Sequence, residues 1–85
     1  MTDDQSRSVT DQMAELHEAS FSWALHCCHY NRDQAEEVLQ NVYLKVLDKK
    51  AVFRGESTFK TWLFAVIRMT ALEMRRSQIS KIMGI

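Results

Sequence analysis

The stretch Phe53-Arg54-Gly55-Glu56-Ser57-Thr58-Phe59-Lys60-Thr61-Trp62-Leu63 decides how this chain folds. It holds one of the two glycines in 85 residues, and Ser57 or Thr58 can cap a helix that starts directly afterwards. The chain has no proline, so residues that break helices are nearly absent elsewhere. The stretch therefore predicts a charged loop followed by a helix, within an all-helical domain.

Apolar periodicity on both sides of this loop predicts three main helices, at residues 10–30, 33–49 and 58–80. The second is expected to open on a capping box, Asp33-x-x-Glu36. Residues 1–9 are expected to form a flexible N-terminal tail, and residues 81–85 a C-terminal tail or truncation point. The prediction is an all-α, compact three-helix bundle over residues 10–80, with a recognition loop between the second and third helices.

Each predicted helix has an apolar face that would pack in the single small core of such a short chain. On the first helix, the apolar stripe runs through Met13, Leu16, Ser20, Trp23, Cys27 and Tyr30. On the second, it comprises Ala35, Val38, Leu39, Val42, Tyr43, Val46 and Leu47. On the third, it comprises Phe59, Trp62, Leu63, Val66, Met69, Thr70 and either Ile67 or Met74.

The charges are unevenly distributed although the formal net charge is zero. Residues 1–40 carry eight acids against two bases, and residues 41–85 carry nine bases against three acids. A basic half suits a phosphate backbone, and an acidic half suits a basic protein surface. The other interpretation is that the two halves neutralise each other inside one bundle.

The sequence contains none of the common catalytic motifs, so no enzyme and no catalytic residue is predicted. The cluster His26-Cys27-Cys28-His29 suggests a metal site, but consecutive helical residues point about 100° apart and cannot all meet one ion. We therefore expect no metal and no cofactor. Adjacent cysteines rarely pair, and no apolar run is long enough to span a membrane. A cytoplasmic protein is expected.

Aromatic and basic residues interleave around the loop and the start of the third helix. Single-stranded nucleic acid is bound by aromatic faces that stack on bases and by cations that follow phosphates. The alternative is that these rings, which have the spacing of a core face, are mostly buried. The aromatic residues are Phe53, Phe59, Trp62 and Phe64, and the bases between and after them are Arg54, Lys60 and Arg68.

Two runs of this sequence resemble region 2 of the bacterial sigma-70 family, in its extracytoplasmic-function (ECF) group. The first is Asn31-Arg32-Asp33-Gln34-Ala35-Glu36-Glu37-Val38-Leu39-Gln40-Asn41-Val42-Tyr43-Leu44-Lys45-Val46, and the second runs from Phe53 to Phe64. The family typically shows a helix similar to the first run, followed by F-R-G-E-S-x-F-x-T-W-L. The two runs in this order, within residues 20–77, make the match specific.

The resemblance implies a domain of a transcription initiation factor that binds core RNA polymerase and recognises and melts the minus-ten promoter element. The second helix would bind the clamp helices of the largest polymerase subunit, and the loop and third helix would hold the non-template strand of promoter DNA. An anti-sigma factor is a further partner that the family implies. The implied polymerase-binding residues are Glu36, Glu37, Gln40, Asn41, Tyr43 and Leu44.

For DNA, the resemblance implies a base pocket and a set of contacts around it. The pocket would draw on Phe53, Phe64, Val66 and Met69. The loop residues Gly55, Glu56 and Ser57 would also contact DNA. The phosphates would lie near Arg54, Lys60, Arg68, Arg75 and Arg76.

The chain departs from the family where the family usually reads I-A-R-N, since here the residues are Val66-Ile67-Arg68-Met69. Methionine can pack on a base but does not read its edge as asparagine does. The basic run that follows is also thinner than usual, and the family's second DNA-binding domain is not within these residues. An alternative function therefore stays open, namely a sigma-like interaction module that binds polymerase or an anti-sigma factor without promoter melting.

Overall fold

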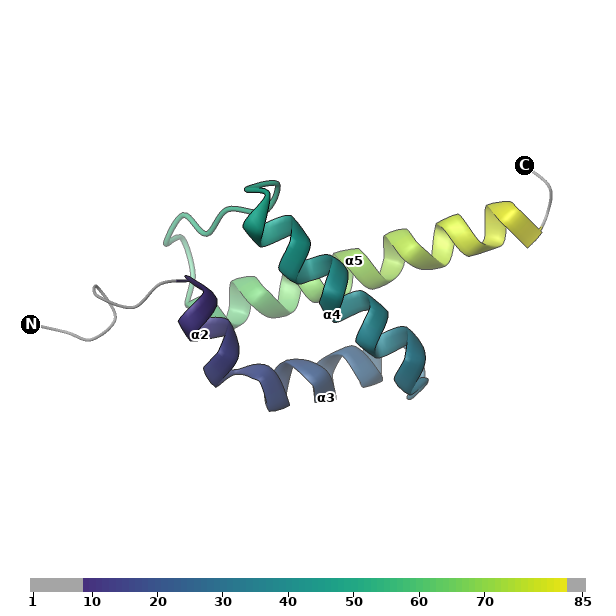
Figure 1. The fold of residues 1–85 in the computed structure, drawn as a ribbon, viewed down its shortest axis with the longest axis horizontal. Coiled ribbons are helices and arrows are strands. Elements are labelled where there is room, and N and C mark those ends of the chain that lie inside the picture. The colour runs from purple at the N-terminus through teal and green to yellow at the C-terminus, as the bar shows by residue number, and fades with distance from the viewer. Residues whose placement is uncertain (1–8, 83–85) are drawn as a thin grey trace, which may run out of the picture.

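The computed structural model describes residues 9–82, and it describes side chains as far as residue 77. Four helices form it: α2 (Val9–Glu15), α3 (His17–Cys27), α4 (Arg32–Leu47) and α5 (Phe59–Ile82) (Figure 1). Residues 9–82 contain no strand, which confirms the all-helical class with four helices in place of three. Each helix in this range is too short or too polar to span a bilayer.

The predicted tails lie largely outside the described residues, which exclude 1–8 and 83–85. Where the structure does describe the predicted tails, it differs from the prediction. Val9 already belongs to α2, and α5 continues two residues past the predicted end, through Lys81 to Ile82.

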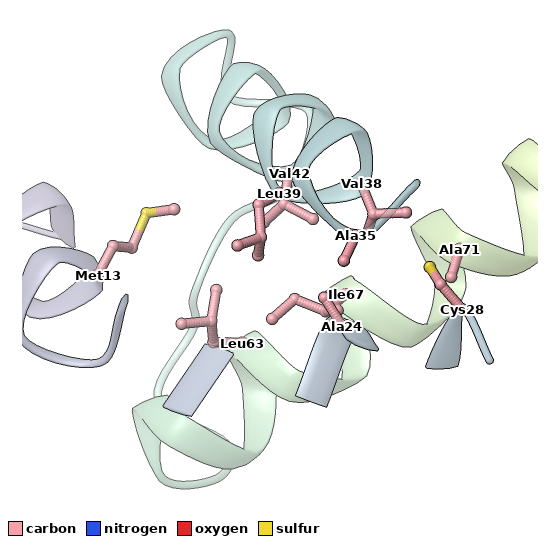
Figure 2. Close-up of a cluster of buried hydrophobic side chains, with 10 residues drawn as sticks. All are labelled: Met13, Ala24, Cys28, Ala35, Val38, Leu39, Val42, Leu63, Ile67 and Ala71. Carbon is pink, nitrogen blue, oxygen red and sulfur yellow. The ribbon is translucent and has the colours of Figure 1, made fainter. Parts of the chain in front are cut away.

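The first predicted helix is divided at Leu16, where the backbone has φ −96° and ψ 10°. The hydrogen bonds that flank the bend are kept: the Leu16 N–H donates to the Gln12 carbonyl at 3.2 Å, and the Ser20 N–H donates to the Leu16 carbonyl at 2.7 Å. The chain therefore bends between α2 and α3 without losing these bonds. Met13 of α2 is buried and joins the core (Figure 2).

The end of α3 corrects the predicted apolar stripe. Helix α3 stops at Cys27, and the next turn places His29 and Tyr30 in the left-handed region, at φ 54° and 63°. Tyr30 is consequently 70% exposed rather than part of the core. The buried face of this segment comprises Ser20, Ala24 and Cys28. Small residues at steps of four allow α3 to approach its neighbours closely.

The start of α4 is capped by Asn31 rather than by the predicted capping box. The Asn31 Oδ1 accepts a hydrogen bond from the Gln34 N–H at 3.0 Å, and the helix begins at Arg32. Asp33 lies inside the first turn, where its charge still suits the positive end of the helix dipole. The prediction of a helix here was correct, but its assigned cap was wrong.

The core lies where α3, α4 and α5 each pack against the other two. Figure 2 shows its side chains converging from these helices, with Met13 approaching from α2. The Ser20 Oγ is also buried there and has no hydrogen-bond partner among the described residues. The buried apolar residues are Met13, Ala24, Cys28, Ala35, Val38, Leu39, Val42, Leu63, Ile67 and Ala71.

A loop connects α4 and α5 at the predicted place, and its role in recognition stays a prediction. Gly55 adopts φ 77°, a left-handed conformation in which a side chain would strain the backbone. Thr58 caps α5, since its Oγ1 accepts a hydrogen bond from the Thr61 N–H at 3.2 Å. The loop therefore leads into α5 with a defined backbone conformation.

Candidate functional site

The outer surface of α4 carries four of the six residues implied in polymerase binding. Glu36, Glu37, Gln40 and Leu44 are all exposed, and Leu44 is 55% exposed despite being apolar. Their spacing places them on one strip of the helix, facing away from α5. We call these four residues the α4 strip. Within the part of the chain whose side chains are described, neither Glu36 nor Glu37 makes an ion pair.

The other two residues, Asn41 and Tyr43, flank the α4 strip and also contact neighbouring helices. The Asn41 Nδ2 donates to the Glu37 carbonyl at 2.9 Å and contacts the Met74 Sδ at 3.4 Å. The Tyr43 hydroxyl forms a hydrogen bond with His17 Nδ1 at 2.9 Å, and burial raises the pKa of Tyr43. Both residues therefore help to hold α4 in place.

Two open grooves run beside the α4 strip, and the His17–Tyr43 pair borders both. The groove between α2 and α4 has a volume of about 530 Å³ and is largely apolar, with Met13 and Leu47 in its lining. The groove between α3 and α4 has a volume of about 680 Å³ and mixed polarity. Its lining comprises His17, Glu18, Phe21, Ser22, Arg32, Glu36, Leu39, Gln40 and Tyr43.

The loop before α5 is held by a cluster of three aromatic rings. The Phe53 ring centroid lies 5.3 Å from that of Phe59 and 5.5 Å from that of Trp62, and the last two lie 5.4 Å apart. All three are half-buried, so the rings serve the fold and still present part of their surface. The loop residues Arg54, Gly55, Glu56 and Ser57 are exposed beside them.

One side of α5 continues from this ring cluster into a groove of about 410 Å³. Trp62, Val66 and Met69 line it, and Met69 is 57% exposed. We call Phe53, Trp62, Val66 and Met69 the loop-side flank of α5. The groove also has charged groups in its lining, from Lys45, Lys50 and Glu73.

Lys45 links α4 to α5 at the border of this groove. Its Nζ donates to the Thr70 Oγ1 at 2.9 Å and to the Glu73 Oε1 at 2.6 Å. Sequence reasoning assigned no contact to Lys45, because only the packing of the two helices brings these residues together. The link positions the wall of the groove against the end of α4.

Phe64 lies on the opposite side of α5, so the predicted pocket of Phe53, Phe64, Val66 and Met69 is not formed as one site. Positions 64 and 66 differ by about 200° around a helix. The Phe64 ring is stacked with Trp23 of α3, with centroids 5.5 Å apart and planes 7° apart. The Trp23 Nε1 also donates to the Phe64 carbonyl at 2.9 Å.

The same side of α5 carries three of the predicted phosphate contacts, Lys60, Arg68 and Arg75, which are exposed. Together with Phe64 we call them the α3-side flank of α5. The Arg75 Nη2 donates to the Cys27 carbonyl at 3.4 Å, at the end of α3. Arg76 is exposed too, but it points about 100° away from Arg75.

The cysteines lie beside this flank as free thiols, with Cys27 half-buried and Cys28 buried. Burial raises the pKa of Cys27, and the neighbouring Cys28 raises it further, whereas Arg68 and Arg75 oppose the shift. Burial raises the pKa of Cys28 as well, so both thiols are protonated at neutral pH. Among the described residues, no three His, Cys, Asp or Glu side chains are grouped so that they could hold a metal ion.

Comparison with known proteins identifies the family. Residues 14–80 match the family model of sigma-70 region 2, so the chain belongs to the sigma-70 region 2 family. It is 40% identical over 48 residues to the ECF RNA polymerase sigma factor SigX of Bacillus subtilis (strain 168), which supports the ECF type. That match covers 56% of this chain and 25% of the relative. No solved structure matches the chain.

Proposed function

We propose that this domain acts in transcription initiation, binding core RNA polymerase through the α4 strip and holding the minus-ten non-template strand on the loop-side flank of α5. The observation that supports the proposal is the separation of the two surfaces. They share no residue, and on α4 the link residue Lys45 points towards α5 while the strip faces away from it. A partner on α4 would leave the groove beside Met69 open.

The α4 strip is suited to a partner with basic and apolar side chains. Its first turns carry Glu36 and Glu37, and its later turns expose Leu44 and, next to the strip, Leu47. Charges that lack an internal partner are available for steering and complementarity at an interface. The family assigns this helix to the clamp helices of the largest polymerase subunit.

Charge reversal tests this docking surface. The double substitution Glu37→Lys and Gln40→Ala should weaken binding to core polymerase at least about fivefold, the loss expected when interface residues worth about 1 kcal/mol are removed. Helicity measured by circular dichroism should be unchanged, because both side chains are exposed. The matched control is Glu56→Lys, the same charge reversal in the loop. Equal polymerase affinity for wild type and double variant would rule out the α4 strip.

The loop-side flank and its surroundings carry side chains that can capture an extruded base. Trp62, Val66 and Met69 supply an apolar wall, and Phe53 supplies an aromatic ring at its edge. Lys50 at the groove and the exposed Arg54 supply cations for the strand's phosphates. Extraction of a base costs a few kcal/mol, which stacking and pocket contacts repay.

Strand capture is tested with a fluorescent minus-ten non-template oligonucleotide added to the complex of this domain with core polymerase. Phe53→Ala should weaken oligonucleotide binding about 5- to 150-fold, the equivalent of about 1–3 kcal/mol for one stacked base. Polymerase binding should change little. Losses of the same size in both assays would show that Phe53 serves only the ring cluster that supports the loop.

The exposed thioether of Met69 favours a second candidate function, the interaction module without promoter melting. Met69 stands where the family usually has asparagine, and it lacks a hydrogen-bond donor for the edge of a base. Polymerase binding together with equal affinity for the minus-ten strand and a scrambled strand would support this second function.

A further inference from the structure

The row of α5 side chains that lines the groove beside Met69 ends on a carboxylate. Its members are spaced by four, three and four positions, so they lie along one side of the helix: Trp62, Val66, Met69 and Glu73. Glu73 lies one turn beyond Met69, about 6 Å farther along the helix axis. A base that packs on the Met69 thioether can therefore present its edge to the Glu73 carboxylate.

Lys45 of α4 holds this carboxylate in place. Helix α4 crosses α5 (Figure 1), and the Lys45 Nζ donates to the Glu73 Oε1 at 2.6 Å and to the Thr70 Oγ1 at 2.9 Å. The Thr70 hydroxyl is itself oriented, because it donates to the Val66 carbonyl at 2.8 Å and Thr70 is only 1% exposed. The buried hydroxyl thus fixes the ammonium group, and the ammonium group fixes the carboxylate.

The pair of Lys45 and Glu73 keeps one acceptor and one donor for a ligand. A carboxylate has two oxygens, and within the described side chains only the Oε1 of Glu73 makes a hydrogen bond. An ammonium group has three N–H bonds, of which Lys45 uses two on the described residues. The Glu73 side chain is 58% exposed and the Lys45 side chain 27%. The edge of a base in the groove therefore meets the free carboxylate oxygen first.

A carboxylate oxygen at this place favours bases that carry an amine. Adenine and cytosine have an exocyclic amine where guanine and thymine have a carbonyl oxygen. The amine donates to the carboxylate in a hydrogen bond that the charge strengthens, whereas a carbonyl oxygen there is repelled and loses its hydrogen bonds to water. Beside the amine, both bases have a ring nitrogen that accepts a hydrogen bond, which suits the remaining donor of Lys45.

We propose that Glu73, positioned by Lys45, reads the extruded base and selects adenine or cytosine through the exocyclic amine. The inference rests on the proposed capture of the strand by the loop-side flank. It separates two tasks within the groove: Met69 supplies a surface on which the base packs, and Glu73 supplies the polar contact that Met69 lacks. A chain with methionine at position 69 can thereby still discriminate between bases.

The test uses the complex of this domain with core polymerase and a fluorescent minus-ten non-template strand. Each adenine of the strand is replaced in turn by hypoxanthine and each cytosine by uracil, so that a carbonyl oxygen takes the place of the amine. At the extruded position, this replacement should weaken binding to the wild type about 5- to 150-fold, as expected for one specific contact to a base edge. Glu73→Gln should remove most of that difference, because a carboxamide donates to a carbonyl as readily as it accepts from an amine.

The matched control is Glu18→Gln, which removes an exposed carboxylate on α3, outside this groove. It should show the same loss on base replacement as the wild type. Two results would overturn the proposal while strand capture stands: a wild type that prefers the minus-ten strand to a scrambled strand but tolerates every replaced base, or a loss that is equally large in Glu73→Gln. Equal wild-type affinity for the unmodified minus-ten and scrambled strands would instead contradict the proposed strand capture, and this proposal with it.

Discussion

The two flanks of α5 are built from the same short run of sequence and offer different chemistry. The loop-side flank presents an apolar groove with the exposed Met69, and its cation Lys45 is paired with Glu73. The α3-side flank presents stacked rings with Lys60 and Arg68, which make no ion pair within the part of the chain whose side chains are described. Because residues two apart on a helix point to opposite sides, one short motif gives α5 an apolar side and a basic, aromatic side.

The largest expected effect comes from the residue that supports both flanks. Ile67 is fully buried on the inner face of α5, so Ile67→Ala should cost about 2–5 kcal/mol of unfolding free energy, measured in urea. Polymerase binding and strand capture should fall together as the folded fraction falls.

Leu72→Ala is the control for Ile67→Ala, since the same helix loses a similar side chain that is 39% exposed. This control should cost less than about 1 kcal/mol. If the two substitutions cost the same, α5 does not depend on the core contact of Ile67, and the two flanks lack the shared support described here.

Restoring a polar group at Met69 should sharpen the difference between the flanks. Met69→Asn gives the groove a donor and an acceptor for a base edge, a contact worth about 1–3 kcal/mol of discrimination. The ratio of affinities for the minus-ten and scrambled strands should rise about 5- to 150-fold. Leu72→Asn, at another exposed apolar position of α5, should leave the ratio unchanged. A ratio that does not rise in Met69→Asn would show that this position does not face the base.

A smaller effect is expected at Trp23, which anchors only the α3-side flank. Trp23→Phe keeps an aromatic ring but removes the donor to the Phe64 carbonyl, so stability should fall by about 1 kcal/mol. Strand capture by the loop-side flank should be retained. Trp62→Phe is the comparison for stability, since within the described residues the Trp62 indole makes no hydrogen bond. Loss of strand capture in Trp23→Phe would show that the flanks are not independent.

The smallest change in unfolding free energy should come from breaking the ion pair between Lys45 and Glu73. Glu73→Gln removes the charge opposite Lys45 at a partly exposed position, where such pairs contribute about 0.2–1 kcal/mol. The difference in unfolding free energy between the wild type and Glu73→Gln should shrink further at high salt, because exposed charges are screened. A difference that does not shrink at high salt would indicate that the Glu73 side chain contributes through packing instead.

The sequence predicted most of the buried face of α4 because its periodicity is clear, but Leu47, also predicted there, is the last residue of the helix and is 63% exposed. Its four buried residues, Ala35, Val38, Leu39 and Val42, all belong to the predicted apolar face. The end of α3 was predicted less well, since apolar spacing carries no information on the left-handed turn that exposes Tyr30. The cap of α4 was misassigned because Asn31 and Asp33 are both capping residue types and lie two positions apart.

The roles of the predicted site residues stay predictions, but the predicted base pocket is divided between two sides of α5. A family motif lists Phe64 and Val66 as near neighbours, whereas helical geometry turns them to opposite sides of α5. The contacts of Trp23 with Phe64 and of Lys45 with Glu73 join residues far apart in the sequence. Such contacts follow from the packing of the helices, which the periodicity of a single helix does not determine.

The most direct test of the two-flank account compares Phe53→Ala with Lys60→Gln/Arg68→Gln in the polymerase complex. The measurement is the affinity of each complex for the minus-ten non-template strand and for a scrambled strand. The account predicts that Phe53→Ala lowers the ratio of the two affinities, while the double variant leaves the ratio unchanged. A ratio lowered to the same degree in both variants would contradict the assignment of base capture to the loop-side flank alone.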